Sequence, residues 1–143
     1  QLVNYKIKLK QSEIIFDEIN TLQKRAIRVI NKSKFDAHTD PLFKNCSILK
    51  VIDIFLLQLG NFMYSYRNGL LPEKFNGIFQ SNNQIHSYNT RNAKAIRAPV
   101  CRTNIRQFSV RFQGPKFFNS LPSDITNITT FSIFKTKLKN YLL

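Results

Sequence analysis

The stretch DIFLLQLGNFMYSYRNG, residues 53–69, decides the fold class. Its bulky apolar residues recur at helical spacing and form one broad stripe. These are Leu56, Leu59, Met63 and Tyr66 on the stripe, with Phe55 and Phe62 beside it. Asp53 is a good N-cap and Gly69 suits a left-handed stop, so we expect a helix over residues 53–68. With so little polar surface, this helix should be the central and most buried one.

Two further helices are expected on either side of this stretch. Residues 12–30 carry apolar side chains at spacings of four and three, with acids early and bases late, an order that complements the helix dipole. The stripe is Ile15, Ile19, Leu22, Ala26 and Val29. Residues 131–142 form a last amphipathic helix, capped by Thr130. Its inward residues are expected to be Phe131, Phe134, Leu138 and Tyr141.

Alternation of apolar and polar residues predicts a small β-hairpin. Its first strand is expected at Ile96, Ala98 and Val100 and its second at Phe108, Val110 and Phe112, where Gly114-Pro115 ends it. A similar alternation over residues 3–9 predicts a short strand. Residues 31–41 read as a polar loop, residues 72–79 as one or two helical turns, and residues 81–104 as an extended loop. The expected fold class is therefore mainly α with a small β-hairpin, a compact helical domain with a long basic loop region.

Length and charge limit the classes of protein that fit. A chain of 143 residues is about one domain long, and its 13 Phe and 5 Tyr argue for a packed core. Lys and Arg number 22 against 8 Asp and Glu, which gives a net charge of +14 and favours a polyanionic partner. The two cysteines are too few for a secreted disulfide framework, and the longest apolar stretch is too short to span a bilayer. We therefore expect an intracellular protein with no membrane partner.

The positive charge is concentrated in one part of the chain. Residues 74–123 contain eight basic residues and no acidic one. Five of the eight are arginine, whose planar fork pairs with phosphate and stacks on bases. Tyr88 stands three residues before Arg91, a mixture that looped or single-stranded nucleic acid favours. The competing interpretation is that these arginines pair with carboxylates inside the fold or serve solubility.

Catalytic motifs are weak in this chain. Asp36, His38 and Asp40 resemble a metal or acid–base cluster, and a metal-dependent nuclease built on them is the least favoured alternative. The cysteines and histidines lack the paired spacing of a zinc site, and no glycine-rich phosphate loop is present. An autonomous active site, a metal, a cofactor and a small-molecule substrate are therefore not expected.

A series of motifs in order resembles one known family. They are LQKRAIRVI at residues 22–30, HTDPLF at 38–43, LQLGNFMYSYRNGLLP at 57–72, HSYNTR at 86–91, CRTN at 101–104, SVRFQGPKFFNSLP at 109–122 and SIFKTKLKNYLL at 132–143. Together they look like the C-terminal region of non-LTR (LINE-type) retrotransposon reverse transcriptases that lack a terminal zinc knuckle. The aromatic residue before NSLP is usually Trp in that family and is Phe118 here.

The resemblance implies a domain downstream of a polymerase thumb. Residues 1–31 would connect the thumb to a basic C-terminal domain, residues 32–143. The family's palm aspartates are absent from this chain, so the fragment itself would not be an enzyme, although its parent protein would be an RNA-directed DNA polymerase. The domain would position template RNA or target DNA for target-primed reverse transcription, in the nucleus.

The predicted nucleic-acid contacts fall into three groups. Phosphate contacts are expected from Arg91, Arg97, Arg102, Arg106, Arg111 and Lys116, base stacking from His86 and Tyr88, and a secondary basic face from Lys135, Lys137 and Lys139. Strand alternation would set Arg111 opposite Phe108, Val110 and Phe112. The alternative function is a structural or protein-interaction module that braces the polymerase thumb, with the basic run incidental.

Overall fold

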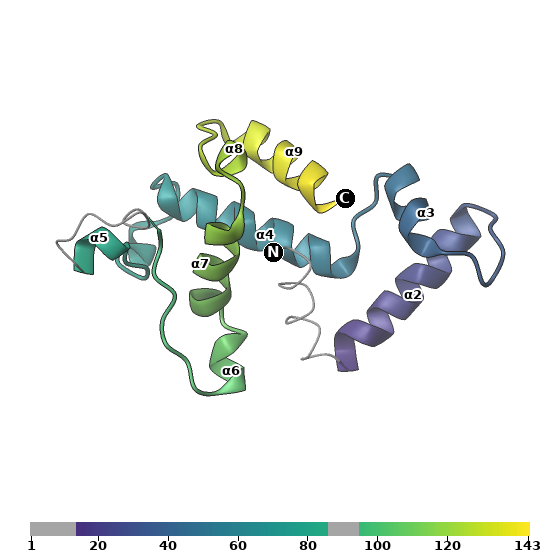
Figure 1. The fold of residues 1–143 in the computed structure, drawn as a ribbon, viewed down its shortest axis with the longest axis horizontal. Helices are drawn as coiled ribbons and strands as arrows, with labels where there is room; N and C mark the ends of the chain where they lie inside the picture. Colours follow the sequence, from purple (N-terminus) through teal and green to yellow (C-terminus); the bar gives the residue numbers. More distant parts are fainter. Residues whose placement is uncertain (1–13, 86–94) are drawn as a thin grey trace. The chain divides into compact units, whose positions relative to one another are not determined.

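The protein, seen in a computed structural model that describes residues 14–85 and 95–143, is mainly helical (Figure 1). The expected fold class is confirmed in this respect. The helices are α2 (Ile14–Ile30), α3 (Thr39–Asn45), α4 (Val51–Arg67), the 3₁₀ turn η1 (Glu73–Phe75), α5 (Asn82–Ile85), α6 (Asn104–Gln107), α7 (Val110–Ser120), α8 (Ser123–Thr126) and α9 (Phe131–Leu142). The strand expected over residues 3–9 lies outside the described residues.

The chain divides into two units. Unit 1 comprises Gln1–Leu57 and Thr136–Leu143, and unit 2 comprises Gln58–Lys135. The helices α4 and α9 each give one part to either unit. The boundary expected between residues 31 and 32 stays a prediction.

In unit 1, α2 packs against α3 through a face that the sequence did not indicate. That face carries Gln23, Ile27 and Asn31, four residues apart, of which Ile27 is buried. The amide of Asn31 donates to the carbonyl of Ile27 at 2.9 Å and to the sulfur of Cys46 at 3.3 Å. The apolar stripe of α2 is exposed instead, with Leu22 61% and Val29 78% accessible. The side-chain amides of Gln23 and Asn31 therefore hold α2 in place by hydrogen bonds. The described residues leave its apolar stripe uncovered.

The helix α4 begins at Val51, before the expected start, so the prediction that Asp53 is its N-cap is wrong. The carbonyl oxygen of Lys50 accepts hydrogen bonds from the N–H groups of Asp53 and Ile54, both at 2.9 Å. The side-chain oxygen of Gln23 accepts from the N–H of Val51 at 3.0 Å, and the Gln23 amide donates to the carbonyl of Leu49 at 2.8 Å. A cap supplied from α2 thus starts the helix earlier than the local sequence indicates.

The rest of α4 agrees with the sequence. Leu56 and Met63 are fully buried, as a central helix requires. Gly69 has φ +65°, and the N–H of Leu70 donates to the carbonyl of Ser65 at 2.9 Å, so the left-handed stop is confirmed. The loop expected over residues 31–41 ends at His38, because Thr39 already begins α3.

Unit 2 is built around an aromatic core. The ring of Tyr64 on α4 stacks on that of Phe134 on α9, with centroids 4.4 Å apart, and its hydroxyl donates to the carbonyl of Thr129. Phe117 and Phe118 of α7 are also buried. The bounds predicted for α9 are confirmed, and Phe134 and Leu138 are inward as expected. Tyr141 is 36% exposed, so the prediction that it faces inward is wrong. Phe131 is 40% exposed, but its ring centroid lies 5.7 Å from that of the buried Tyr64, so it faces the core in part.

The predicted β-hairpin is wrong. Val110 and Phe112 lie in α7, which continues through Gly114 and Pro115, and Phe108 precedes it. The carbonyl of Ser109 accepts from the N–H groups of Phe112 and Gln113, which sets the first turn of a helix. The buried positions in α7 are Gln113, Gly114, Pro115, Phe117 and Phe118. Burial of this helical face stabilises the helix more than the apolar–polar alternation of residues 108–112, which is only five residues long, favours a strand.

The proposed partner strand is also absent from the described residues. Ile96 makes one isolated antiparallel bridge, with Ser81, and residues 97–103 have no regular structure. The loop expected over residues 81–104 is interrupted by α5 and ends where α6 begins. The expected turn near residue 73 is confirmed as η1.

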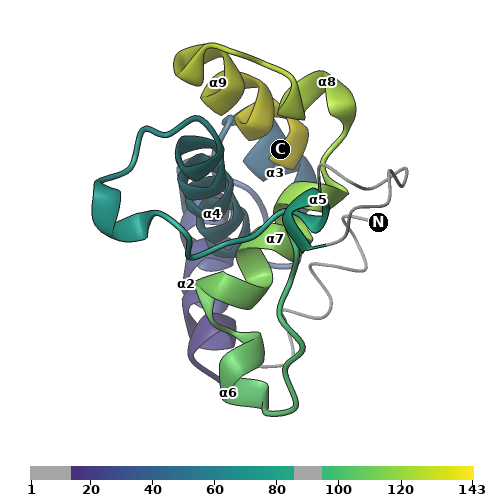
Figure 2. The same ribbon diagram turned by 90° about the vertical axis from the view of Figure 1, so that its left-hand side faces the viewer.

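Figures 1 and 2 show α7 against the part of α4 that belongs to unit 2. The two helices come close at Gly114, where a Cβ atom would lie 2.5 Å from the sulfur of Met63. Met63 is fully buried, so its side chain has little room to move aside. A side chain at residue 114 would therefore require the Met63 side chain to shift.

We expect Gly114→Ala to lower the free energy of unfolding by about 1–2 kcal/mol, because overpacking outweighs the gain in helix propensity. Denaturant unfolding followed by circular dichroism measures this change. Adding Met63→Ala removes the obstructing sulfur, so the double variant should be more stable than the sum of the two single changes predicts. Stabilisation by Gly114→Ala alone, as at an uncrowded helical glycine, would contradict the packing.

Candidate nucleic-acid interface

Three of the predicted phosphate-binding residues line a single hollow in unit 2. Arg97, Arg106 and Arg111 are all exposed and border an open pocket of about 570 Å³, which we call the arginine pocket. Its remaining lining is Gly77, Ile78, Phe79, Gln80, Pro99, Val100, Cys101 and Ser109. The chain brings these residues together from three separate segments.

The first wall, residues 77–80, is held by Tyr66 of α4. Its hydroxyl donates to the carbonyl of Phe79 at 2.8 Å and accepts from the Phe79 N–H at 3.3 Å. The two rings also meet edge to face, with centroids 4.8 Å apart. Gly77 has φ +77°, a left-handed conformation that allows the chain to turn there. This wall is fixed at its backbone, and Arg111 donates to its Ile78 carbonyl at 3.5 Å.

The second wall, residues 97–101, is held from two sides. The N–H of Arg97 donates to the carbonyl of Gln80 at 2.8 Å. The side chain of Asn119, at the end of α7, donates to the carbonyl of Ile96 at 2.7 Å and accepts from the Ile96 N–H at 3.2 Å. The Asn119 side chain therefore makes with Ile96, next to Arg97, the pair of hydrogen bonds that the backbone of a neighbouring strand would make. Figure 1 shows this part of the chain running beside α7 towards α6.

The third wall is the junction between α6 and α7. The Ser109 hydroxyl donates to the carbonyl of Arg106 at 2.7 Å, and the buried Gln113 amide donates to the carbonyl of Gln107 at 2.6 Å. Arg111 lies in the first turn of α7, where the helix dipole adds positive potential. Arg106 and Arg111 are thus held on either side of a helix N-terminus.

The charges of the pocket are not neutralised within the fold. Among the residues that the structure describes, none of the three arginines forms an ion pair with a carboxylate, and no acidic residue lines the pocket. Its surface also has apolar parts, since Val100 is 86% exposed and Pro99 is exposed beside it. Exposed arginines that border one hollow without a carboxylate partner among the described residues suit an anion such as phosphate.

The other predicted residues are less closely grouped. Arg102 is exposed but does not line the pocket, and the ammonium of the exposed Lys116 lies 5.2 Å from the ring centroid of Phe112. The lysines of α9 are exposed and fall in different units, Lys135 in unit 2 and Lys137 and Lys139 in unit 1. The remaining three, His86, Tyr88 and Arg91, lie outside the described residues. The strand-based placement of Arg111 opposite its apolar neighbours is wrong, because Arg111 lies in a helix.

A second hollow of about 680 Å³ shares Arg97 with the arginine pocket. It also contains Arg67, whose guanidinium donates to the carbonyl of Thr126 at 3.1 Å and lies 5.9 Å from the ring centroid of Phe118. Amide side chains complete much of its lining, namely Asn82, Asn119 and Asn127. Sequence reasoning missed Arg67, since it precedes the basic run, and missed Asn119 and Tyr66, whose roles depend on distant backbone partners.

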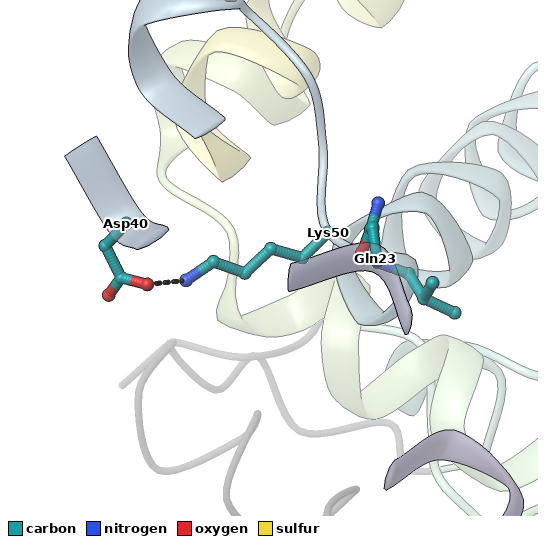
Figure 3. Close-up of polar contacts among 4 residues, drawn as sticks. Gln23, Asp40 and Lys50 are labelled. Carbon is teal, nitrogen blue, oxygen red and sulfur yellow. Dashed lines mark hydrogen bonds and ion pairs between the residues drawn. The ribbon is translucent and has the colours of Figure 1, made fainter. Parts of the chain in front are cut away.

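The Asp36, His38 and Asp40 cluster does not assemble into a site. The described residues contain no group of acidic, histidine and cysteine side chains arranged to hold a metal ion. Asp40 forms an ion pair with Lys50 at 2.8 Å (Figure 3), and this hydrogen bond holds the pKa of Asp40 below its usual value. Lys50 is thus already paired with the Asp40 carboxylate, which a nuclease built on this cluster would need.

Comparisons with known proteins add no relative. No family model matches the chain, and neither a curated protein nor a solved structure is significantly similar to it. None of the described helices is long and apolar enough to cross a membrane.

We expect Asn119→Leu to lower the free energy of unfolding by about 1–3 kcal/mol, because it leaves the N–H and carbonyl of Ile96 without their partner. Denaturant unfolding measures this loss. Asn76→Leu is a matched control, since the described structure shows no side-chain hydrogen bond for this exposed amide. Equal effects of the two changes would contradict the role assigned to Asn119.

Proposed function

We propose that this chain is a nucleic-acid-binding domain without catalytic activity of its own. The observation that carries the proposal is that Arg97, Arg106 and Arg111 border one open pocket and have no carboxylate partner among the described residues. Arginines that served only the fold would face acids or buried carbonyls. Arg111 makes only one contact of that kind, at 3.5 Å, and its side chain remains exposed. The guanidinium groups therefore retain donors for a ligand.

The resemblance places this activity in a larger protein. On that basis the chain is the C-terminal domain of a non-LTR retrotransposon reverse transcriptase, which positions template RNA or target DNA for target-primed reverse transcription in the nucleus. The net charge of +14 supports the proposal, because phosphate neutralisation relieves the repulsion among the basic residues.

One observation favours the alternative, a module that braces the polymerase thumb. The stripe of Ile19, Leu22 and Val29 on α2 is exposed in the structure, and apolar helix stripes commonly contact another protein surface. The stripe lies in unit 1, whereas the arginine pocket lies in unit 2. Substitutions in the two units therefore test the two functions separately.

We expect Arg111→Glu to weaken binding to RNA and DNA by about tenfold or more at fixed salt, since a charge-assisted hydrogen bond is worth about 1.5–3 kcal/mol. Fluorescence anisotropy with labelled oligonucleotides measures the affinity. Arg25→Glu is the matched control, because this exposed arginine of α2 undergoes the same change of charge away from the pocket.

The control should lose much less affinity than Arg111→Glu. Circular dichroism must show that both variants keep their helices. Unchanged affinity of a folded Arg111→Glu variant, or equal losses in both variants, would contradict the assignment of the arginine pocket as the binding site.

A further inference from the structure

We propose that the arginine pocket receives a single unpaired nucleotide, so that the domain prefers single-stranded nucleic acid to continuous duplex. The inference rests on the proposed function and specifies the form of its ligand. It follows from three properties of the pocket, namely its concave shape, the three arginines that border it and its apolar parts.

The shape limits what can enter. A volume of about 570 Å³ lies within the range of about 300–1,000 Å³ that is usual for sites that enclose a small ligand. Three chain segments border it, and the backbone bonds of Tyr66 and Asn119 hold two of them in place. A nucleotide within a duplex is held in its stack, and extracting it costs a few kcal/mol. An unpaired nucleotide enters without that cost.

Basic residues from different segments border the hollow. Arg97 comes from the segment before α6, Arg106 from α6 and Arg111 from the first turn of α7. A phosphate group accepts several such donors at once, and guanidinium groups bind it in a bidentate manner. This arrangement differs from a flat stripe of lysines, which would track the regularly spaced phosphates of a duplex without enclosing any of them.

The apolar parts provide a place for the base. Val100 and Pro99 are exposed on the same segment as Arg97, and Ile78 is half-buried on the first wall. An unstacked base packs against apolar side chains and against guanidinium planes. A base that remains stacked in a duplex cannot make these contacts, because its two faces already pack against its neighbours.

The neighbouring hollow allows the strand to continue. It shares Arg97 with the arginine pocket and adds Arg67 and the exposed amide side chain of Asn127. Amides carry both donors and acceptors, which suit the edges of unpaired bases. Arg97 thus lies where the backbone of a strand would pass from one hollow to the next.

Cys101 makes the proposal testable, because it lines the arginine pocket as a free, half-buried thiol. The other cysteine, Cys46, is also free and half-buried but lies in unit 1, so it serves as an internal reference. Iodoacetamide is an uncharged reagent whose approach the basic pocket does not bias. Mass spectrometry of the digested 143-residue chain gives the alkylation rate at each cysteine separately.

The rates are compared without ligand, with a saturating single-stranded oligonucleotide, and with the saturating duplex of the same sequence. Fluorescence anisotropy confirms saturation under the labelling conditions. We expect the single strand to slow alkylation of Cys101 by about fivefold or more while Cys46 is unchanged, and the duplex to leave both rates close to those of the free protein. In the Arg106→Ala variant, protection by the same concentration of single strand should be weaker.

Equal protection of Cys101 by the two bound ligands would overturn the preference for an unpaired nucleotide and leave the proposed function intact. Binding of the single strand without protection of Cys101 would overturn the pocket as the site. Failure of either ligand to bind at low salt would overturn both the inference and the proposed function.

Discussion

The organisation of unit 2 depends on the close approach of α7 to α4 at Gly114. A side chain at this position would meet the buried sulfur of Met63, so the present contact between the two helices makes use of its absence. The helix seated in this way carries functional groups at both ends. Arg111 lies in its first turn and borders the pocket, while Asn119 lies in its last turn and holds the backbone beside Arg97. The positions of Arg111 and Asn119 therefore depend on a packing contact that contains no charge.

The positive charge of the pocket determines which ligand this arrangement suits. The chain has 22 Lys and Arg against 8 Asp and Glu, and the described ion pair between Asp40 and Lys50 lies in unit 1. Among the described residues of unit 2, no carboxylate pairs with the arginines of the pocket. Solvated cations held close together repel one another, and that repulsion is relieved when a polyanion binds. The bonds of Tyr66 and Asn119 hold two walls of the pocket without neutralising its arginines, because they join uncharged side chains to uncharged backbone groups.

The sequence predicted the helices well where their pattern was long. The apolar stripe of α4, the left-handed stop at Gly69 and the bounds of α9 could all be read locally. The hairpin was wrong because an alternation over five residues competes with the buried face of α7, which becomes visible only once Gly114 meets Met63. The orientation of α2 was not predictable either, since Gln23 and Asn31 find their partners 15 or more residues away.

The candidate site also has features that the local sequence predicted and features that depend on distant partners. A count of charges along residues 74–123 identified the arginines of the pocket, because a run of bases without acids is a local property. It could not show that Arg97, Arg106 and Arg111 share a pocket while Arg102 does not line it, nor that Arg67 lies at the adjoining hollow. Those relations depend on the bonds of Tyr66 to Phe79 and of Asn119 to Ile96, which span 13 and 23 residues.

The central claim is that unpaired arginines bind the phosphates of a nucleic acid. The most direct test is the affinity of the intact chain for a single-stranded RNA across a series of salt concentrations. Release of counterions from about three contacted phosphates gives log affinity a slope of about −2 against log salt, and further contacts make it steeper. Such a linear decrease is the predicted result. A flat dependence on salt, or no binding at low salt, would contradict the account and favour the module that contacts protein through α2.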